Sequence, residues 1–275
     1  MKGAHPDALP IAGGTDVMVE INFDRHRPPA FIDLTRIAEL SEWGQEGDWL
    51  RIGAGVTYTR LIAELGDRLP GLAMASRTVG SPQIRNRGTV GGNLGSASPA
   101  GDAHPPLLAS GAIVELASAA GTRRLPADEF FVGPKRNAMR KDELIAAFLV
   151  EPAKGPQQFS KVGTRNAMVI AVCSFALAID SERRRIGTGI GSAAPTPVRA
   201  IEAELFLAGV LDEKGLWEKP AAVDESALAR FGQLVAAAAN PIDDVRGTAA
   251  YRRHALAVMA RRGFVWAWND YRGNA

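Results

Sequence analysis

The sequence is poor in residues that bind metals or form disulfides. Cys173 is its one cysteine, which excludes a disulfide framework, an iron–sulfur cluster or a cysteine-rich zinc site held by this chain alone. The four histidines lack the short spacings of metal ligands; they are His5, His26, His104 and His254. We therefore expect no metal site within this chain.

An excess of one charge and long apolar runs are also lacking. The chain has 32 Lys and Arg against 30 Asp and Glu, and the formal net charge of +2 gives no electrostatic case for a nucleic-acid or membrane-surface partner. The longest nearly apolar run, residues 168–179, is too short to cross a bilayer, and residues 1–10 contain no apolar segment typical of a signal peptide. These absences predict a cytoplasmic protein with no integral membrane segment.

The hydrophobic content of the sequence, 46% of its 275 residues, is sufficient for two packed domains. A polar stretch with proline, glycine and glutamine, residues 151–158, is the predicted boundary. Thr57 is the predicted N-cap of the first long helix. The strands expected before the boundary are 30–34, 49–55, 112–118 and 143–150, and the helices expected there are 57–65, 71–79 and 102–111.

Beyond the boundary we expect two long strand regions followed by a helical tail. Residues 187–192, GTGIGS, look like a damaged dinucleotide fingerprint, but no strand–turn–helix unit surrounds them, and a glycine-kinked strand is the better interpretation. Gly209 is the predicted C-cap of the first tail helix, and Arg252 is expected on a solvated or partner-facing surface. The strand regions are 159–163 with 168–179, and 184–194; the helices are 198–209, 225–239 and 248–262.

Two glycine-rich segments are the main candidates for a binding site. They are residues 10–20, PIAGGTDVMVE, and residues 88–93, GTVGGN. A glycine pair lets the backbone adopt positive φ, so that consecutive N–H groups can point into one concavity that binds an anionic oxygen such as phosphate. Thr15, Thr89 and Asn93 add polar side chains beside these glycines. The two segments could cradle the two halves of a pyrophosphate; the alternative is that both are only tight turns.

Several motifs, in this order along the chain, resemble one protein family. They are AGGTD (12–16), IRNRGTVGGNL (84–94), SPAGDAHPPLLA (98–109), FSKVGTR (159–165) and the stretch 191–255. Together they resemble the FAD-binding medium subunit of molybdenum hydroxylases, the family of xanthine dehydrogenase and aerobic carbon monoxide dehydrogenase. The resemblance covers nearly the whole chain, and it is the combination of motifs that makes it specific.

The resemblance implies an α+β fold of two domains. Residues 1–155 would form a two-lobed FAD-binding domain of the vanillyl-alcohol-oxidase (PCMH) type, and residues 156–275 a smaller α+β C-terminal domain. Relatives usually carry a strand and a helix ahead of the first glycine segment, which here starts close to Met1. The resemblance therefore implies an N-terminally short FAD-binding domain, with weaker FAD binding as the expected consequence.

The resemblance also assigns the cofactor-binding residues. Asp102 would contact the ribityl chain, with a helix N-cap as the alternative, and Ile145 (or Leu144) would lie beside the isoalloxazine. Lys161 would stabilise negative charge on the reduced flavin, with a surface lysine as the alternative. Val79 stands where some relatives have an aromatic residue over the flavin. The glycine segments would bind the pyrophosphate through Pro10, Ile11, Ala12, Gly13, Gly14, Thr15, Asp16 and Val17, and through Thr89, Val90, Gly91, Gly92 and Asn93.

Two nearby arginines fit two different roles. Arg85 and Arg87 precede the second glycine segment, and they could reach phosphate or face a subunit interface. The residues alone do not favour either role.

The function implied by the resemblance is electron relay by an oxidoreductase subunit, with no catalytic side chain of its own. A large partner subunit with a molybdenum cofactor would oxidise the substrate, and a small subunit would pass electrons through two [2Fe–2S] clusters to the FAD of this chain. NAD, oxygen or another compound would accept them, and the family suggests a dimer of heterotrimers. The alternatives are a stand-alone flavin oxidase and a flavin-free assembly subunit. Against the oxidase, no histidine lies in either glycine segment, and the chain after residue 155 has no compact acid–base set.

Overall fold

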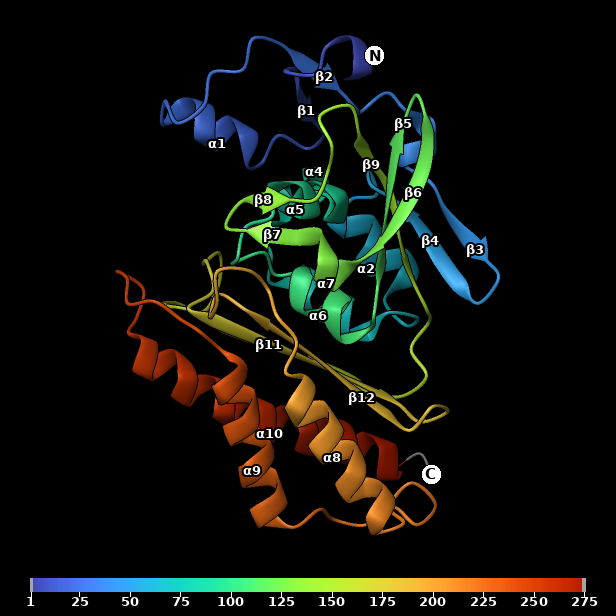
Figure 1. The fold of residues 1–275 in the computed structure, drawn as a ribbon, viewed down its shortest axis with the longest axis vertical. Coiled ribbons are helices and arrows are strands. Elements are labelled where there is room, and N and C mark those ends of the chain that lie inside the picture. The colour runs from blue at the N-terminus through green and yellow to red at the C-terminus, as the bar shows by residue number, and fades with distance from the viewer. Residues whose placement is uncertain (1, 274–275) are drawn as a thin grey trace.

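The computed structural model describes residues 2–273, and Figure 1 shows two layered parts stacked along the long axis. The first part is built on an antiparallel five-stranded sheet in the order β3-β4-β9-β5-β6. The strands are β3 (Trp43–Glu46), β4 (Trp49–Gly53), β5 (Ile113–Ser118), β6 (Gly121–Pro126) and β9 (Leu144–Val150). One apolar core joins this sheet to the helices α2 (Tyr58–Leu65), α3 (Pro70–Arg77), α5 (Val90–Ser96) and α6 (His104–Ala109).

A small unit at the N-terminal end lies apart from this sheet. Strands β1 (Leu9–Ile11) and β2 (Phe31–Asp33) pair in parallel, and helix α1 (Val17–Asn22) connects them (Figure 1). The shorter elements of the first part are η1 (Lys2–Ala4), η2 (Ala38–Leu40), α4 (Pro82–Arg87), α7 (Ala127–Phe130), β7 (Phe131–Gly133) and β8 (Arg136–Asn137).

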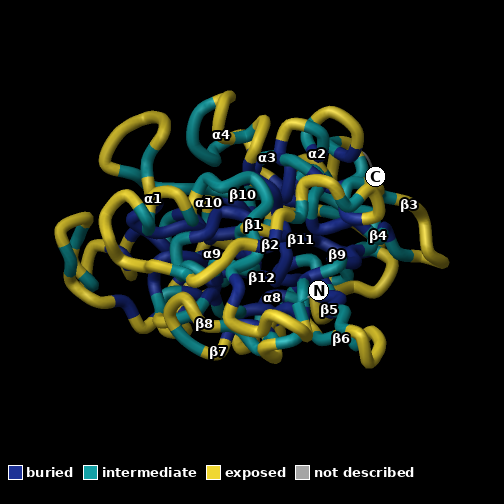
Figure 2. The backbone as a smooth tube through the Cα atoms, turned by 90° about the horizontal axis from the view of Figure 1, so that it is seen from above, coloured by how far each residue is buried: buried dark blue, intermediate teal, exposed yellow. Residues whose placement is uncertain are grey.

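The second part is a three-stranded antiparallel sheet with helices on its outer face (Figure 1). Its elements are β10 (Gln157–Val162), β11 (Cys173–Asp180), β12 (Arg185–Gly191), α8 (Ile201–Glu213), α9 (Glu225–Ala238) and α10 (Ala249–Gly273). Every residue of β11 is buried, because α10 packs on one side of this sheet and α3 and α6 of the first part contact it from the other. Figure 2 shows β11 in the buried interior, with exposed backbone around α1 and β3. The result is the mixed α+β, two-domain fold that the sequence predicted.

Glycines of β12 allow this close packing of the two parts. A Cβ added to Gly187 would lie 1.9 Å from the carbonyl oxygen of Ala109, and one added to Gly189 would lie 2.0 Å from that of Pro105. The backbone of α6 therefore rests directly on the sheet. Residues 187–191 are strand, as predicted, and they are not a dinucleotide-binding turn.

Local sequence signals predicted some helix ends correctly and others wrongly. The side chain of Thr57 caps α2, accepting a hydrogen bond from the N–H of Arg60 at 3.3 Å. Gly209 does not cap α8: the helix continues to Glu213, because its buried apolar face extends to Leu211. The residue with positive φ after this helix is Gly215 instead, with φ of 60°.

The expectation of a solvated Arg252 is also wrong. This side chain is 5% exposed, and it donates hydrogen bonds to the carbonyl oxygen of Ser192 and the carboxylate of Asp244. It therefore ties α10 to the loops that follow β12 and α9.

Candidate functional site

The two glycine segments lie against one another, although residues 21–87 separate them in the sequence. A Cβ added to Gly13 would lie 2.0 Å from the carbonyl oxygen of Arg87, which precedes the second segment. Gly14 has φ of 75°, a conformation that costs glycine little and other residues more. The first segment therefore turns sharply at Gly14 while its backbone packs on the second.

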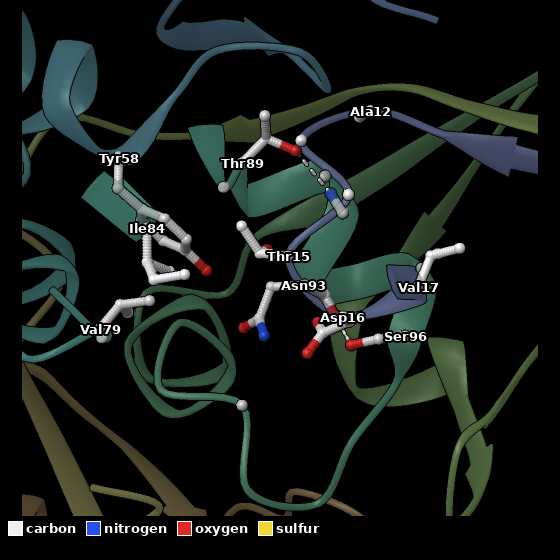
Figure 3. A pocket seen from close by; sticks show the side chains of 18 of the residues that line it. Ala12, Thr15, Asp16, Val17, Tyr58, Val79, Ile84, Thr89, Asn93 and Ser96 are labelled. Carbon is white, nitrogen blue, oxygen red and sulfur yellow. Dashed lines mark hydrogen bonds between the residues drawn. The ribbon is translucent and has the colours of Figure 1, made fainter. Parts of the chain in front are cut away.

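The second glycine segment is the start of helix α5 rather than an open loop. Thr89 is the N-cap, and its hydroxyl oxygen accepts a hydrogen bond from the N–H of Gly92 at 2.8 Å (Figure 3). Neither Gly91 nor Gly92 has positive φ, so the prediction of a left-handed pair is wrong here. Gly91 is needed for space instead, because a Cβ there would lie 2.4 Å from the carbonyl oxygen of Ala54.

A cavity of about 890 Å³ opens between the two segments. Most of the residues predicted to bind the cofactor line it: Pro10, Ala12, Gly13, Gly14, Thr15, Asp16, Val17, Thr89, Gly91, Gly92, Asn93, Asp102 and Ile145. Three do not line it: Ile11, Val90 and Lys161. Val90 is fully buried in the apolar core, and Lys161 lies behind Asp102. Val79 and Leu144 line the cavity too.

Several lining residues were not found from the sequence. Tyr58 and Ile84 come from helices α2 and α4, Lys135 from the turn between β7 and β8, and Met168 from the loop between β10 and β11. No spacing pattern marks these residues, because tertiary packing alone brings them together. The nearest sequence signals were the N-cap Thr57 beside Tyr58, and Ile84 as the first residue of the motif 84–94, but neither assigned these side chains to the site.

Asp102 and Lys161 form a buried ion pair between the two parts of the chain. The Nζ of Lys161 lies 2.5 Å from Oδ2 of Asp102, and both side chains are 8% exposed. The hydroxyl of Thr78 donates to the same carboxylate oxygen at 3.1 Å. Burial nevertheless raises the pKa of Asp102, against the opposing effects of Lys161 and Thr78. Lys161 is thus not a surface lysine, and Asp102 is not an N-cap, since Ala103 holds that position in α6.

His104 supports the polar wall of the cavity from behind. It is fully buried, and burial lowers its pKa to about 4, so the imidazole is neutral. Its Nε2 lies 3.0 Å from the carbonyl oxygen of Asn93 and must carry the proton, because a carbonyl oxygen only accepts. A Cβ added to Gly101 would lie 2.3 Å from the ring. His104 therefore fixes the backbone at two cavity-lining residues.

Charged residues near the rim have structural partners. Lys135 pairs with Glu20 of α1 at 2.5 Å, which ties the N-terminal unit to the rest of the first part. Arg85 donates to the carbonyl oxygens of Arg77, Val79 and Gly80, so it braces a turn and does not face the cavity.

The described residues 2–273 contain no group of three or more His, Cys, Asp or Glu side chains arranged to hold a metal ion. Cys173 is buried, and burial raises the pKa of its thiol to about 12, which disfavours a thiolate. Within the same part of the chain, no helix combines the length and apolar character needed to cross a membrane.

Fold and cavity thus define a two-domain cofactor-binding protein, and comparison with known proteins specifies the family. Residues 1–151 match the FAD-binding domain in molybdopterin dehydrogenase, and residues 158–267 match the CO dehydrogenase flavoprotein C-terminal domain. The chain belongs to this family of FAD subunits of molybdenum-containing dehydrogenases, and its cofactor is FAD.

Individual relatives agree with the family match. The nicotinate dehydrogenase FAD-subunit of Eubacterium barkeri is 35% identical over 181 residues, which are 63% of this chain and 61% of that subunit. The xanthine dehydrogenase FAD-binding subunit of Escherichia coli O157:H7 is 33% identical over 211 residues, 73% of this chain and 72% of the relative. The structure of carbon monoxide dehydrogenase from Hydrogenophaga pseudoflava superposes with a TM-score of 0.86 at 28% identity, covering 96% of this chain and 90% of that one.

The cavity fits FAD in size and in chemistry. Ligand and cofactor sites commonly have volumes of about 300–1,000 Å³, and this cavity falls in that range. Three buried polar atoms of its lining have no hydrogen-bond partner within the described chain: the hydroxyl of Tyr58, Oδ1 of Asn93 and Oδ1 of Asp102. Buried polar atoms are normally paired, so these three mark places for the polar groups of a ligand.

Proposed function

We propose that this chain relays electrons inside a molybdenum-containing hydroxylase. Its FAD would receive them from [2Fe–2S] clusters of a small partner subunit and deliver them to NAD, oxygen or another acceptor, while a large partner subunit holds the molybdenum cofactor. The cavity between the two packed glycine segments is the observation that carries this proposal. A heterotrimer, paired into a dimer, is the proposed assembly.

The chain's own cysteine content supports a partner as the source of electrons. Iron–sulfur clusters are held by several cysteine thiolates, whereas this chain offers Cys173 alone, buried and with a raised thiol pKa. Relatives named as medium chains, such as the glyceraldehyde dehydrogenase medium chain of Sulfolobus acidocaldarius, favour a subunit over a stand-alone oxidase.

We propose the following roles for the lining. Backbone N–H groups at Gly13 and Gly14 and the Thr15 side chain would bind the pyrophosphate, and Asp102 would use its free Oδ1 to accept from a ribityl hydroxyl. Ile145 would exclude water beside the isoalloxazine. FAD, when bound, supplies the redox chemistry, and the protein sets its position and electrostatics.

We place the domain boundary between residues 155 and 156. Two separate apolar cores support this division, one formed by residues between Leu50 and Val150 and the other by residues between Cys173 and Trp268. Lys161 would then be a contribution of the C-terminal domain to the cofactor site, made through Asp102.

The proposal is tested on the complete complex, purified with its partner subunits. The complex is reduced with dithionite and mixed with NAD or oxygen, and reoxidation of the flavin and of the clusters is followed by their absorbance. A Gly13→Val variant of this chain, expected to lose FAD, is treated in the same way. We expect its clusters to be reduced normally and reoxidised far more slowly.

Two outcomes would count against the proposal. Equally fast cluster reoxidation in the FAD-free variant would show that electrons leave by another route. A wild-type chain that stays colourless after FAD is added, yet still binds its partners, would point to the flavin-free assembly subunit.

A further inference from the structure

Tyr58 is a buried tyrosine whose hydroxyl group has no partner. The residue is 2% exposed, and its hydroxyl makes no hydrogen bond within residues 2–273. It stands at the start of α2 and was not among the residues predicted to bind the cofactor. A hydroxyl removed from water without a new hydrogen bond is unfavourable, so this one calls for an acceptor.

The position of the ring is fixed by the second glycine segment. The N–H of Tyr58 donates to the carbonyl oxygen of Gly88 at 3.0 Å, and Thr57 forms an antiparallel bridge with Thr89. The ring packs on the same backbone, because a Cβ added to Gly88 would lie 3.4 Å from Cδ2 of Tyr58. The side chain therefore cannot swing away to find a partner elsewhere.

The hydroxyl faces the cofactor cavity and is a hydrogen-bond donor there. Figure 3 shows it directed toward the space that Thr15 and Asn93 also face. Burial raises the pKa of Tyr58 well above its usual value, and the carboxylates of Asp102 and Asp16 add to this effect. The group thus keeps its proton at any ordinary pH.

We propose that the Tyr58 hydroxyl donates a hydrogen bond to an oxygen of bound FAD and so helps to position the cofactor. This inference rests on the proposed placement of FAD in the cavity. If this residue served only as apolar lining, an aromatic ring without a hydroxyl would suffice, and Val79 and Ile84 already supply apolar surface there. The acceptor lies either on the pyrophosphate or on the flavin half of FAD.

The test uses Tyr58→Phe, which removes the hydroxyl and keeps the ring. Without FAD, the variant should melt at the wild-type temperature or above, because a buried unpaired group is lost. The dissociation constant for FAD should rise about tenfold, the usual size of one lost hydrogen bond. Tyr271→Phe is the matched control, since that hydroxyl donates to the carbonyl oxygen of Trp217 at 3.1 Å. It should lower the melting temperature and leave FAD affinity unchanged.

The outcomes separate this inference from the placement of FAD. A wild-type chain without affinity for FAD would overturn both. Wild-type affinity in Tyr58→Phe, or a loss of stability in its FAD-free form, would overturn the role of Tyr58 alone. Binding of ADP, which carries the pyrophosphate but no flavin, then locates the acceptor: equal weakening for ADP and FAD places it on the pyrophosphate, and weakening for FAD alone places it on the flavin half.

Discussion

The buried histidine behind the cavity makes the stability of this protein depend on pH in a way that can be calculated. Burial lowers the pKa of His104 from 6.5 to about 4. Between these values the unfolded chain binds a proton that the folded chain does not, so stability falls as the pH is lowered through this window. Once the pH is below both pKa values, this shift lowers the free energy of unfolding by about 3 kcal/mol. From pH ~7 to pH ~5 the expected loss is about 2 kcal/mol.

The substitution that isolates this effect is His104→Gln. Glutamine does not titrate, and its amide can still donate to the carbonyl oxygen of Asn93 as Nε2 of His104 does. We would measure the free energy of unfolding in urea at both pH values for the wild type and the variant. All other groups are shared, so their contributions cancel in the comparison.

We expect the wild type to lose about 2 kcal/mol more than the variant on acidification, whatever the difference between the two proteins at neutral pH. His254→Gln, at an exposed position of α10, controls for the exchange itself. An identical pH dependence in the wild type and in His104→Gln would refute the reasoning, because it would mean that the imidazole is protonated as readily in the folded protein as in the unfolded chain.

Three further tests, made with five substitutions, examine the packing around the site. Gly189→Ala should lower the melting temperature, because its Cβ would lie 2.0 Å from a carbonyl oxygen of α6. The Cβ of Gly209→Ala meets nothing within 4 Å, so this variant should be more stable by up to about 1 kcal/mol. If both variants were stabilised, or both destabilised, this reasoning would be wrong. Lys161→Met should lower the free energy of unfolding in urea by about 3 kcal/mol, and adding Asp102→Asn to it should restore most of that loss. A Lys161→Met protein as stable as the wild type would exclude a structural ion pair. Gly13→Ala should lose FAD from the purified protein, since its Cβ would lie 2.0 Å from the facing backbone, and FAD binding at wild-type affinity would show that the two segments can separate without harm.

The sequence predicted those features whose cause is local. The helix starting after Thr57 is one example, because a hydroxyl that caps a helix acts within three residues. The strand at residues 187–191 is another, since no strand–turn–helix unit surrounds its glycines. The C-terminus of α8 was predicted wrongly for the opposite reason. Gly209 carries a local stop signal, but burial of Leu211 favours continuation of the helix, and this depends on tertiary packing.

The glycines of the site are required for two different physical reasons. Gly14 is needed for its positive φ, which we expected of the glycine pairs in both segments. Gly13 and Gly91 are needed because another backbone segment passes where a Cβ would be. That second cause cannot be derived from a sequence alone, since the segments that make contact are far apart along the chain.

Lys161 illustrates a similar limit for polar residues. Its place in a motif suggested direct contact with the cofactor, whereas its Nζ binds Oδ2 of Asp102 and the carbonyl oxygen of Thr78. The other carboxylate oxygen of Asp102 remains without a partner at the cavity. Asp102 therefore binds Lys161 through one oxygen, and in the proposed placement of FAD its other oxygen would face the ligand. If FAD binds as we propose, docking of the C-terminal part and binding of the cofactor are energetically coupled, because loss of Lys161 would leave the carboxylate of Asp102 as a buried and unpaired charge.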